Sequence, residues 1–356
     1  MNPSHYIIAC FLCDPVSNGR LSSPGEDSRY WNSTEKCIQS ALQLKRMIGE
    51  EMGFQFKFTW LIRTDRHVEM THGDSAWPLK KFEKLWKQVK DSGDEIGWLF
   101  YPTNLTNGEW SQDDSGDLIE LMSQSHEAFK NTLTSPQTSY FGWNGLTQAS
   151  MKQLASLGVK IDLSAVPGLY TISHKRHKPE VGACDWEISP KIPYHPSTFD
   201  YRRPTAYPNE PALNILEVPC TIVKNQWARV KATLGDLWKV GNLGPRYNWK
   251  RRRQGIPLKL DNTPNFFQTA VRSQFESKNQ KPVPLILVTN MLALLSKNLQ
   301  KNMQWLAKEA SSQGTLIRSG LAEESWEVWS NPSQIGLDPR RFQFIHKDHE
   351  SDFEKK

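Results

Sequence analysis

Short apolar runs alternate with amphipathic stretches along most of the chain. The apolar runs predict buried strands over residues 6–12, 56–63, 95–101, 139–143, 159–164, 215–218, 284–289 and 315–318. Apolar positions at three- and four-residue spacing predict helices over residues 34–52, 77–89, 117–132 and 147–157, from Pro264 onward, and over 291–312. Strands that alternate with helices indicate a parallel sheet covered by helices, so we expect the α/β fold class.

The helix predicted over 77–89 has the clearest pattern. Asp74 or Ser75 can cap its start, Pro78 suits its first turn, and Gly93 suits the left-handed position beyond its end. One face carries the apolar residues Trp77, Leu79, Phe82, Leu85, Trp86 and Val89.

Two long segments and a polar tail interrupt the alternation. The segment 165–211 is rich in Pro and Tyr and is too long for a simple connector, so we expect a functional or rim-building loop. A second loop over 241–263 is basic, and residues 331–356 form a polar tail. We expect residues 1–330 to fold as one domain with these two loops.

Composition excludes several classes of protein. The chain has 356 residues, of which 38% are hydrophobic and 23% charged, as is usual for globular proteins. Its longest apolar runs fall far short of the roughly 20 residues that a membrane span needs. Its beginning lacks the basic region of a secretion signal, and its five cysteines are sparse and odd in number. We therefore expect a cytoplasmic location with reduced thiols.

The net charge of +6 is modest, and much of it lies in Arg246 and the run 250–253. With Tyr247 and Trp249 interleaved, this stretch could contact phosphates and bases, although a solvated or anion-facing loop is the more common explanation. Since no other nucleic-acid signature is present, we do not expect a nucleic-acid partner.

In parallel α/β sheets, chemistry gathers at the carboxyl ends of the strands. Six motifs lie at or near these ends: Asp94-Glu95-Ile96-Gly97-Trp98, Gly142-Trp143-Asn144, the run from Asp162 to Gly168, Asp185-Trp186, Pro193-Tyr194-His195-Pro196 and Asp200-Tyr201-Arg202. Together they resemble the polysaccharide deacetylase family, in particular its long-loop intracellular branch.

The resemblance implies a distorted (β/α)7-type barrel and removal of an acetyl group from an amino sugar. In the family, one aspartate and two histidines hold a divalent ion that polarises the acyl carbonyl and activates water. A second aspartate acts as base, and a late-strand histidine protonates the leaving amine.

This chain departs from the family at most of those functional positions. Cys13 and Asp14 align with the paired acids, so one carboxylate is retained. Leu99 replaces one ligand histidine, and Tyr101 or Thr103 replaces the other. Tyr140 stands in place of an arginine, and Thr289-Asn290-Met291 in place of the late histidine motif. We therefore expect no cofactor, and a zinc-like divalent ion only if the site has been rebuilt around Asp14.

The remaining candidates follow from residue type and position. Asp14, Cys13, Asp65 and His67 could take part in catalysis, with Cys13 as a nucleophile if His67 lowered its pKa. Alternatively, Cys13 is a small buried hydrophobe on the opposite side of its strand from Cys10. His174 and His177 are spaced as metal ligands on a helix turn, but loop packing is the more common role.

Aromatic and polar side chains near the barrel rim predict a cleft for sugars or other flat ligands. The aromatic candidates are Trp98, Tyr101, Trp143, Trp186, Tyr194 and Tyr201. The polar candidates are Arg63, Asp65, Glu95, Asn144, Asp185, His195 and Arg202. Glu95 and Asp162 could instead be framework residues that hydrogen-bond strand ends.

Three hypotheses for function remain. The chain could bind or hydrolyse an N-acyl or glycan-like substrate with a lost or rebuilt metal centre. It could instead be a non-catalytic protein that binds a carbohydrate or a protein partner. The third hypothesis is a changed, metal-independent reaction in the biosynthesis of a small molecule or glycan. We therefore expect a carbohydrate or an N-acylated small molecule as the partner, and no membrane.

Overall fold

The structure is a computed structural model that describes residues 5–14, 31–106, 109–112, 117–171, 184–207, 209–223, 256–276, 283–312 and 317–331. A parallel sheet forms its centre, with strand order β10-β7-β6-β3-β2-β1-β13 and with β14 also paired to β1. These strands are β1 (His5–Cys13), β2 (Phe58–Arg63), β3 (Glu95–Phe100), β6 (Thr138–Phe141), β7 (Ile161–Asp162), β10 (Leu216–Glu217), β13 (Val283–Asn290) and β14 (Ile317–Ser319). Thr221, just beyond β10, donates its backbone N–H to the carbonyl of Ile286 in β13 (3.0 Å), so the sheet curls toward closure.

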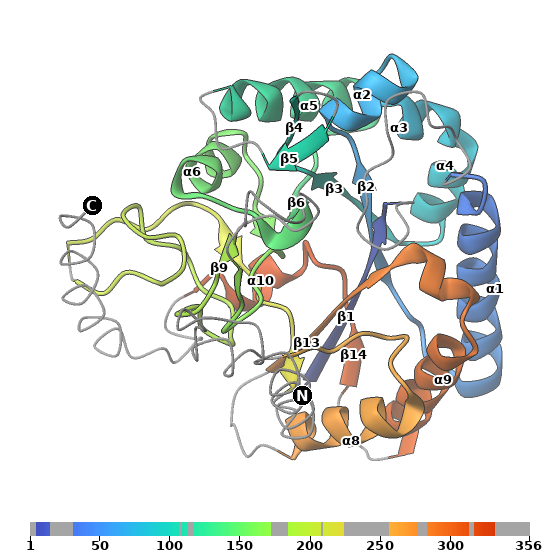
Figure 1. Ribbon diagram of the computed structural model, residues 1–356. Helices are drawn as coiled ribbons and strands as arrows, with labels where there is room; N and C mark the ends of the chain where they lie inside the picture. Colours follow the sequence, from blue (N-terminus) through green and yellow to red (C-terminus); the bar gives the residue numbers. More distant parts are fainter. Residues whose placement is uncertain are drawn as a thin grey trace, which may run out of the picture.

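Helices cover the outer face of the curled sheet, as Figure 1 shows. They are α1 (Thr34–Met52), α2 (Arg66–His72), α3 (Trp77–Lys81), α4 (Glu83–Asp91), α5 (Leu118–Thr132), α6 (Gln148–Ser156), α8 (Pro264–Phe275), α9 (Lys297–Ser312) and α10 (Ser325–Trp329). The expected distorted (β/α)7-type barrel is confirmed. The described parts of the long segment 165–211, namely residues 165–171, 184–207 and 209–211, lie on the left of Figure 1, away from α1.

Short antiparallel strand pairs lie outside the main sheet. They are β4 (Thr103–Thr106) with β5 (Glu109–Gln112), β8 (Tyr170–Thr171) with β9 (Cys184–Asp185), and β11 (Ile222–Val223) with β12 (Ile256–Pro257).

Two predicted helices differ from the structure. The pattern over 77–89 was interpreted as one helix, but the chain breaks at Phe82 (φ −112°) into α3 and α4. The expected Pro78 and Gly93 positions are confirmed, since Gly93 has φ +80°. The predicted 291–312 helix begins as a 3-10 turn (Met291–Leu295), and α9 starts only after Ser296. Asn290 caps that turn by accepting the N–H of Leu292 (2.9 Å).

Alternation along the strands separates two apolar layers. Odd-numbered residues of β1 and even-numbered residues of β2 and β3 pack against the helices, as Phe11, Trp60 and Trp98 do. The opposite parity lines the barrel interior, where Cys10 and Leu99 lie in a second buried cluster. Because side chains alternate across a strand, this parity decides which strand-end residues can reach the mouth.

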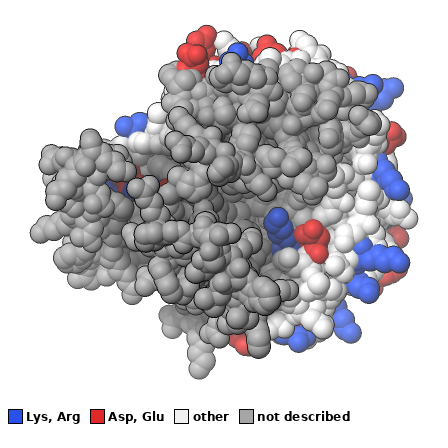
Figure 2. Space-filling model, viewed as in Figure 1, with Lys and Arg blue, Asp and Glu red and all other residues white. Residues whose placement is uncertain are grey.

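The surface drawn in Figure 2 shows blue and red side chains interspersed over its described part, rather than one single-sign patch. The basic stretch 246–253, His174, His177 and the tail beyond 331 lie outside the described residues. Within the described residues, no helix combines the length and the apolar character that crossing a bilayer requires.

Candidate functional site

The carboxyl ends of β1 and β2 bring together a buried charged cluster. Asp14 follows β1, Arg63 ends β2, and Asp65 begins the turn into α2. Arg63 donates from Nη1 to Asp14 Oδ1 (3.2 Å) and from Nε to Asp65 Oδ2 (2.6 Å). Its Nη2 reaches Asp65 Oδ1 at 3.3 Å. One guanidinium therefore bridges two carboxylates of the predicted site.

Tyr101 covers this cluster from the end of β3. Its hydroxyl donates a short hydrogen bond to Asp14 Oδ2, and its ring lies over the Arg63 guanidinium, 4.4 Å from centroid to Cζ. Its backbone N–H also donates to Asp65 Oδ2 (3.4 Å). Burial and the charge of Asp14 raise the pKa of the Tyr101 phenol well above 10, so it remains a donor at neutral pH.

The cluster is almost closed to solvent. Asp14 is 4% exposed, Arg63 1% and Asp65 0%. Burial alone lowers the pKa of the Arg63 guanidinium, but attraction to Asp65 and Asp14 outweighs it and leaves that pKa raised. The charge on Arg63 is therefore fixed at every relevant pH.

Asp65 also has a local role that its sequence position did not reveal. Its Oδ1 accepts the N–H of Val68 (3.0 Å), so it is the N-cap of α2. Asn290 was missed as a site residue. It donates its side-chain amide to the backbone carbonyl of Asp14 (2.8 Å) and thereby holds the end of β1. The only feature of the sequence that could have identified Asn290 is its position directly after an apolar strand.

Trp143 and Asn144 form the partly exposed rim beside Tyr101. Both have left-handed backbone conformations, with φ 56° and 57°, which are uncommon for residues with side chains. Asn144 stabilises the turn by donating to Tyr140 Oη (3.0 Å) and to the carbonyl of Ser164 (2.7 Å). The turn places the Trp143 ring edge-on to Tyr101, with ring centroids 5.3 Å apart.

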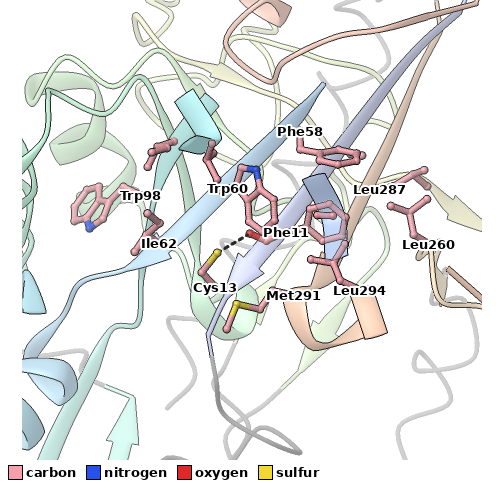
Figure 3. Packing of buried hydrophobic residues seen from close by; sticks show 14 of the residues in the cluster. Phe11, Cys13, Phe58, Trp60, Ile62, Trp98, Leu260, Leu287, Met291 and Leu294 are labelled. Atoms are coloured by element: carbon pink, nitrogen blue, oxygen red, sulfur yellow. Dashed lines mark hydrogen bonds between the residues drawn. The ribbon is translucent and has the colours of Figure 1, made fainter. Parts of the chain in front are cut away.

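Cys13 does not face this cluster. Figure 3 shows its sulfur among Phe11, Met291 and other apolar residues of the helix-facing layer, and its thiol points to the Phe11 carbonyl (3.7 Å). Burial raises the pKa of Cys13 well above its usual value, with Cys37 and Asp14 contributing. A nucleophilic thiolate needs a lowered pKa and access to the mouth, so the burial of Cys13 in the apolar layer gives the nucleophile hypothesis no support. The expected separation from Cys10 is confirmed.

His67 lies in the first turn of α2 and is buried (5% exposed). Its backbone carbonyl accepts the hydroxyl of Thr71 (2.7 Å). Its predicted partner, the Cys13 thiol, is enclosed in the apolar layer and is not activated, so the Cys–His arrangement has no support.

Several predicted rim aromatics are buried instead. Trp98 is fully buried toward α5, where its indole N–H donates to Ser125 Oγ (3.1 Å). Trp186 and Tyr194 are also fully buried. Trp186 donates to the carbonyl of Asn144 (2.9 Å), so it supports the rim without offering its face to a ligand. The prediction that these three rings stack on a ligand is therefore wrong.

The polar candidates of the long loop contact one another. Arg202 pairs with Asp185 through a short contact and with Asp200 (Nε to Oδ1, 2.8 Å). Tyr201, also predicted at the rim, packs edge-on against Trp186 at 5.0 Å. His195 lies between the carbonyls of Ile215 and Ser330, each 2.8 Å from a ring nitrogen. The contacts of Arg202 and Tyr201 hold parts of this loop together, and His195 links the loop to Ile215 and Ser330, so these side chains already have partners in the fold.

The two remaining acidic candidates are framework residues. Glu95, at the amino end of β3, accepts hydrogen bonds from Thr59 (2.7 Å), Thr138 and the backbone of Glu323 (3.1 Å). Asp162 accepts from Ser139 (2.7 Å), and it pairs in register with Glu217 of β10. Burial and the neighbouring Asp162 raise the pKa of Glu217 well above its usual value.

An open hollow of about 520 Å³ lies between α2 and α5. Its lining residues are Arg66, Glu69, Met70, Asp117, Glu120, Leu121 and Gln124. None of the residues in the charged cluster lines it.

Within the described ranges, no three His, Cys, Asp or Glu side chains are grouped as metal ligands. At the fold's expected metal position, Asp14 has both oxygens occupied by Arg63 and Tyr101, while Leu99 is a buried apolar side chain. The residues present therefore do not fit a divalent ion.

Comparisons with known proteins establish the fold. No family model matches the chain, and no curated protein matches it in sequence. Among solved structures, a Mycobacterium smegmatis protein assigned to the polysaccharide deacetylases is 9% identical, with a TM-score of 0.52 and 92% of this chain and 91% of that chain covered. Puue allantoinase is 11% identical (TM-score 0.52, 91% of each chain covered). A Pseudomonas aeruginosa PAO1 protein assigned to the polysaccharide deacetylases is 12% identical (TM-score 0.50, 91% of each chain covered). The chain thus has the polysaccharide deacetylase fold, as its motifs predicted.

Proposed function

We propose that this protein binds a glycan-like or N-acylated ligand at the mouth of a deacetylase-type barrel and does not carry out metal-assisted hydrolysis. The observation that carries the proposal is the closed network of Asp14, Arg63 and Tyr101. The carboxylate at the expected metal position is already neutralised by a guanidinium and capped by a phenol.

The chemistry of the donor set supports this reading. Metal-assisted deacetylation needs three protein ligands and an open coordination position for water. Asp14 is the only such ligand retained, because Leu99 cannot coordinate and Tyr101 stays protonated. Loss of the ligands together with pairing of the remaining carboxylate favours binding over hydrolysis.

The rim that remains suits a flat, partly apolar ligand. Trp143 is half-buried beside Tyr101, and its left-handed backbone costs free energy, of order 1–3 kcal/mol for such a conformation. Hydrogen bonds from Asn144 and Trp186 stabilise that conformation. Strained backbone conformations of this kind concentrate at functional sites. Indole faces stack well on sugar rings.

Two of the similar structures are assigned to the polysaccharide deacetylases, which makes carbohydrate the ligand class of this proposal. An N-acetylated amino-sugar oligomer offers an apolar ring face that suits the indole of Trp143.

The test is a calorimetric titration of the full chain with N-acetylated amino-sugar oligomers in the presence of EDTA. We expect binding that persists without metal and weakens about tenfold in Trp143→Ala, equivalent to about 1.4 kcal/mol. Trp305→Ala is the matched control, because Trp305 packs on the outer helical layer against Phe267. Its affinity should equal that of the unsubstituted protein.

Two results would contradict the proposal. Release of acetate from these oligomers by protein supplied with Zn²⁺, abolished by EDTA, would show metal-assisted hydrolysis. Equal affinity in Trp143→Ala and Trp305→Ala would show that the ligand does not use this rim.

A further inference from the structure

We infer that the Arg63 guanidinium is a built-in cation that occupies, in this chain, the position at which the fold's enzymes hold a divalent ion. The inference deepens the proposed function, since it concerns the same site, but it does not depend on which ligand binds there. Its basis is the arrangement of Asp14, Arg63, Asp65 and Tyr101.

Every oxygen of the two carboxylates already has a partner. Asp14 Oδ1 accepts from Arg63 Nη1 (3.2 Å), and Asp14 Oδ2 accepts from the Tyr101 hydroxyl. Asp65 Oδ2 accepts from Arg63 Nε (2.6 Å), and Asp65 Oδ1 accepts from Val68 N (3.0 Å). A metal ion at Asp14 would have to displace Arg63 or Tyr101 from that carboxylate.

Burial makes this displacement unfavourable. Arg63 is only 1% exposed and its guanidinium packs on the Tyr101 ring, so moving it away from Asp14 would break both the ion pair and the ring contact. A buried charge that loses its partner is strongly destabilising. The buried carboxylates of Asp14 and Asp65 therefore require a positive charge nearby, and the side chain of Arg63 provides it.

A guanidinium and a divalent metal ion both attract carboxylates, but the guanidinium carries one positive charge and the metal ion two, and their chemistry differs. Arginine offers N–H donors and no empty coordination position, so it cannot bind a water molecule and lower its pKa as a metal does. The substitution keeps the geometry of the mouth while removing the activated water.

When Arg63 is shortened, we expect the stability of the protein to depend on an added cation. In Arg63→Ala, Asp14 and Asp65 face a space of guanidinium shape under Tyr101. We expect a lower Tm that rises again on addition of methylguanidinium or of Mn²⁺, a cation suited to carboxylate ligands. In the unsubstituted protein neither additive should raise the Tm.

Arg272→Ala is the matched control, because Arg272 makes an exposed ion pair with Glu309 on the helical surface (3.0 Å). Its Tm should not respond to either additive. Arg63→Lys keeps the charge, so it should be more stable than Arg63→Ala and should show no response to Mn²⁺.

A direct measurement keeps the inference testable even if Arg63→Ala does not fold. The unsubstituted protein, dialysed against Zn²⁺ or Mn²⁺, should retain less than one equivalent of metal. One equivalent that is lost in Asp14→Asn would overturn the inference, as would an Arg63→Ala protein whose Tm is indifferent to both cations. Failure of sugar binding alone would contradict the proposed function and leave this inference standing.

Discussion

At the scale of single residues, strand parity determines which side chains can act at the barrel mouth. Cys13 and Asp14 are neighbours in sequence, yet Cys13 packs against the helices and Asp14 faces Arg63. Trp98 and Leu99 likewise point to opposite faces of their strand, Trp98 toward the helices and Leu99 into the barrel interior. Of two neighbouring residues at a strand end, therefore, only the one that points to the barrel interior can belong to a site at the mouth.

Thiol reactivity tests the placement of Cys13. All five cysteines of the chain are buried, and burial raises the pKa of Cys13. We expect iodoacetamide to label the native protein more slowly than a free-thiol peptide, and to label it fully after unfolding in urea. Rapid native labelling that maps to Cys13 would contradict its burial.

Gly142 makes room for Tyr101. A Cβ atom at position 142 would lie 2.1 Å from the Tyr101 ring, which Asp14 and Arg63 hold in place. We expect Gly142→Ala to lower the free energy of unfolding by about 1–3 kcal/mol through overpacking. Urea denaturation measures this change.

Gly49→Ala is the matched control for Gly142→Ala. The new methyl group would meet only the flexible end of the Gln55 side chain, and position 49 lies inside α1. Since Ala favours a helix interior over Gly, we expect no loss of stability. Equal losses in the two variants would show that the Tyr101 ring is free to move.

At the scale of elements, α2 depends on Asp65 twice. Asp65 caps the helix through Val68 N and also neutralises Arg63 at the end of β2. No helix was predicted at this position, because the segment is short and its apolar periodicity is weak. The cap couples the first turn of α2 to the charged cluster.

Substitution of Asp65 separates the two roles. We expect Asp65→Ala to cost about 3–5 kcal/mol, because it leaves a buried guanidinium with one carboxylate fewer. Asp65→Asn keeps an acceptor for Val68 N and should cost less. Thr147→Ala, which removes the cap of α6 without touching a charge, should cost about 0.5–2 kcal/mol. Equal losses in Asp65→Ala and Thr147→Ala would exclude a role for the ion pair.

At the scale of the whole molecule, Glu95 ties the amino ends of β2, β3 and β6 to the chain near Glu323. Burial, with a contribution from Glu323, raises the pKa of Glu95 from 4.5 to about 7. The folded protein therefore holds a proton that the unfolded chain has lost between these pH values. Its contribution to stability is complete below about pH 4.5 and is lost as pH rises through about 7.

Glu95→Gln removes this titration while retaining a hydrogen-bonding side chain. Relative to the variant, the unsubstituted protein should lose on the order of 2 kcal/mol between pH 5 and pH 8. Thermal unfolding of both proteins at the two pH values measures it. Glu35→Gln, at an exposed position of α1, should show no such difference. A Glu95→Gln difference that is constant with pH would contradict the raised pKa.

Much of the fold followed from the sequence alone. Continuous apolar runs for buried parallel strands and three-and-four spacing for the helices are local patterns, and they placed β1, β2, β3, β13 and α1 correctly. The motifs at strand ends resembled those of the polysaccharide deacetylases, and that resemblance implied the barrel. The break at Phe82 and the 3-10 turn after Asn290 were missed, since both depend on packing against the rest of the molecule.

Only the tertiary structure decided what the site contains. Sequence identified Asp14, Arg63, Asp65 and Tyr101 as separate candidates, but it could not show that one guanidinium bridges both carboxylates. That pairing joins three strands through contacts between residues 36 to 87 positions apart, together with a local one. Hydrogen bonds and burial over such separations are properties of the folded chain. The sequence showed that metal ligands were missing, but only the tertiary structure showed that Arg63 pairs with the remaining carboxylates.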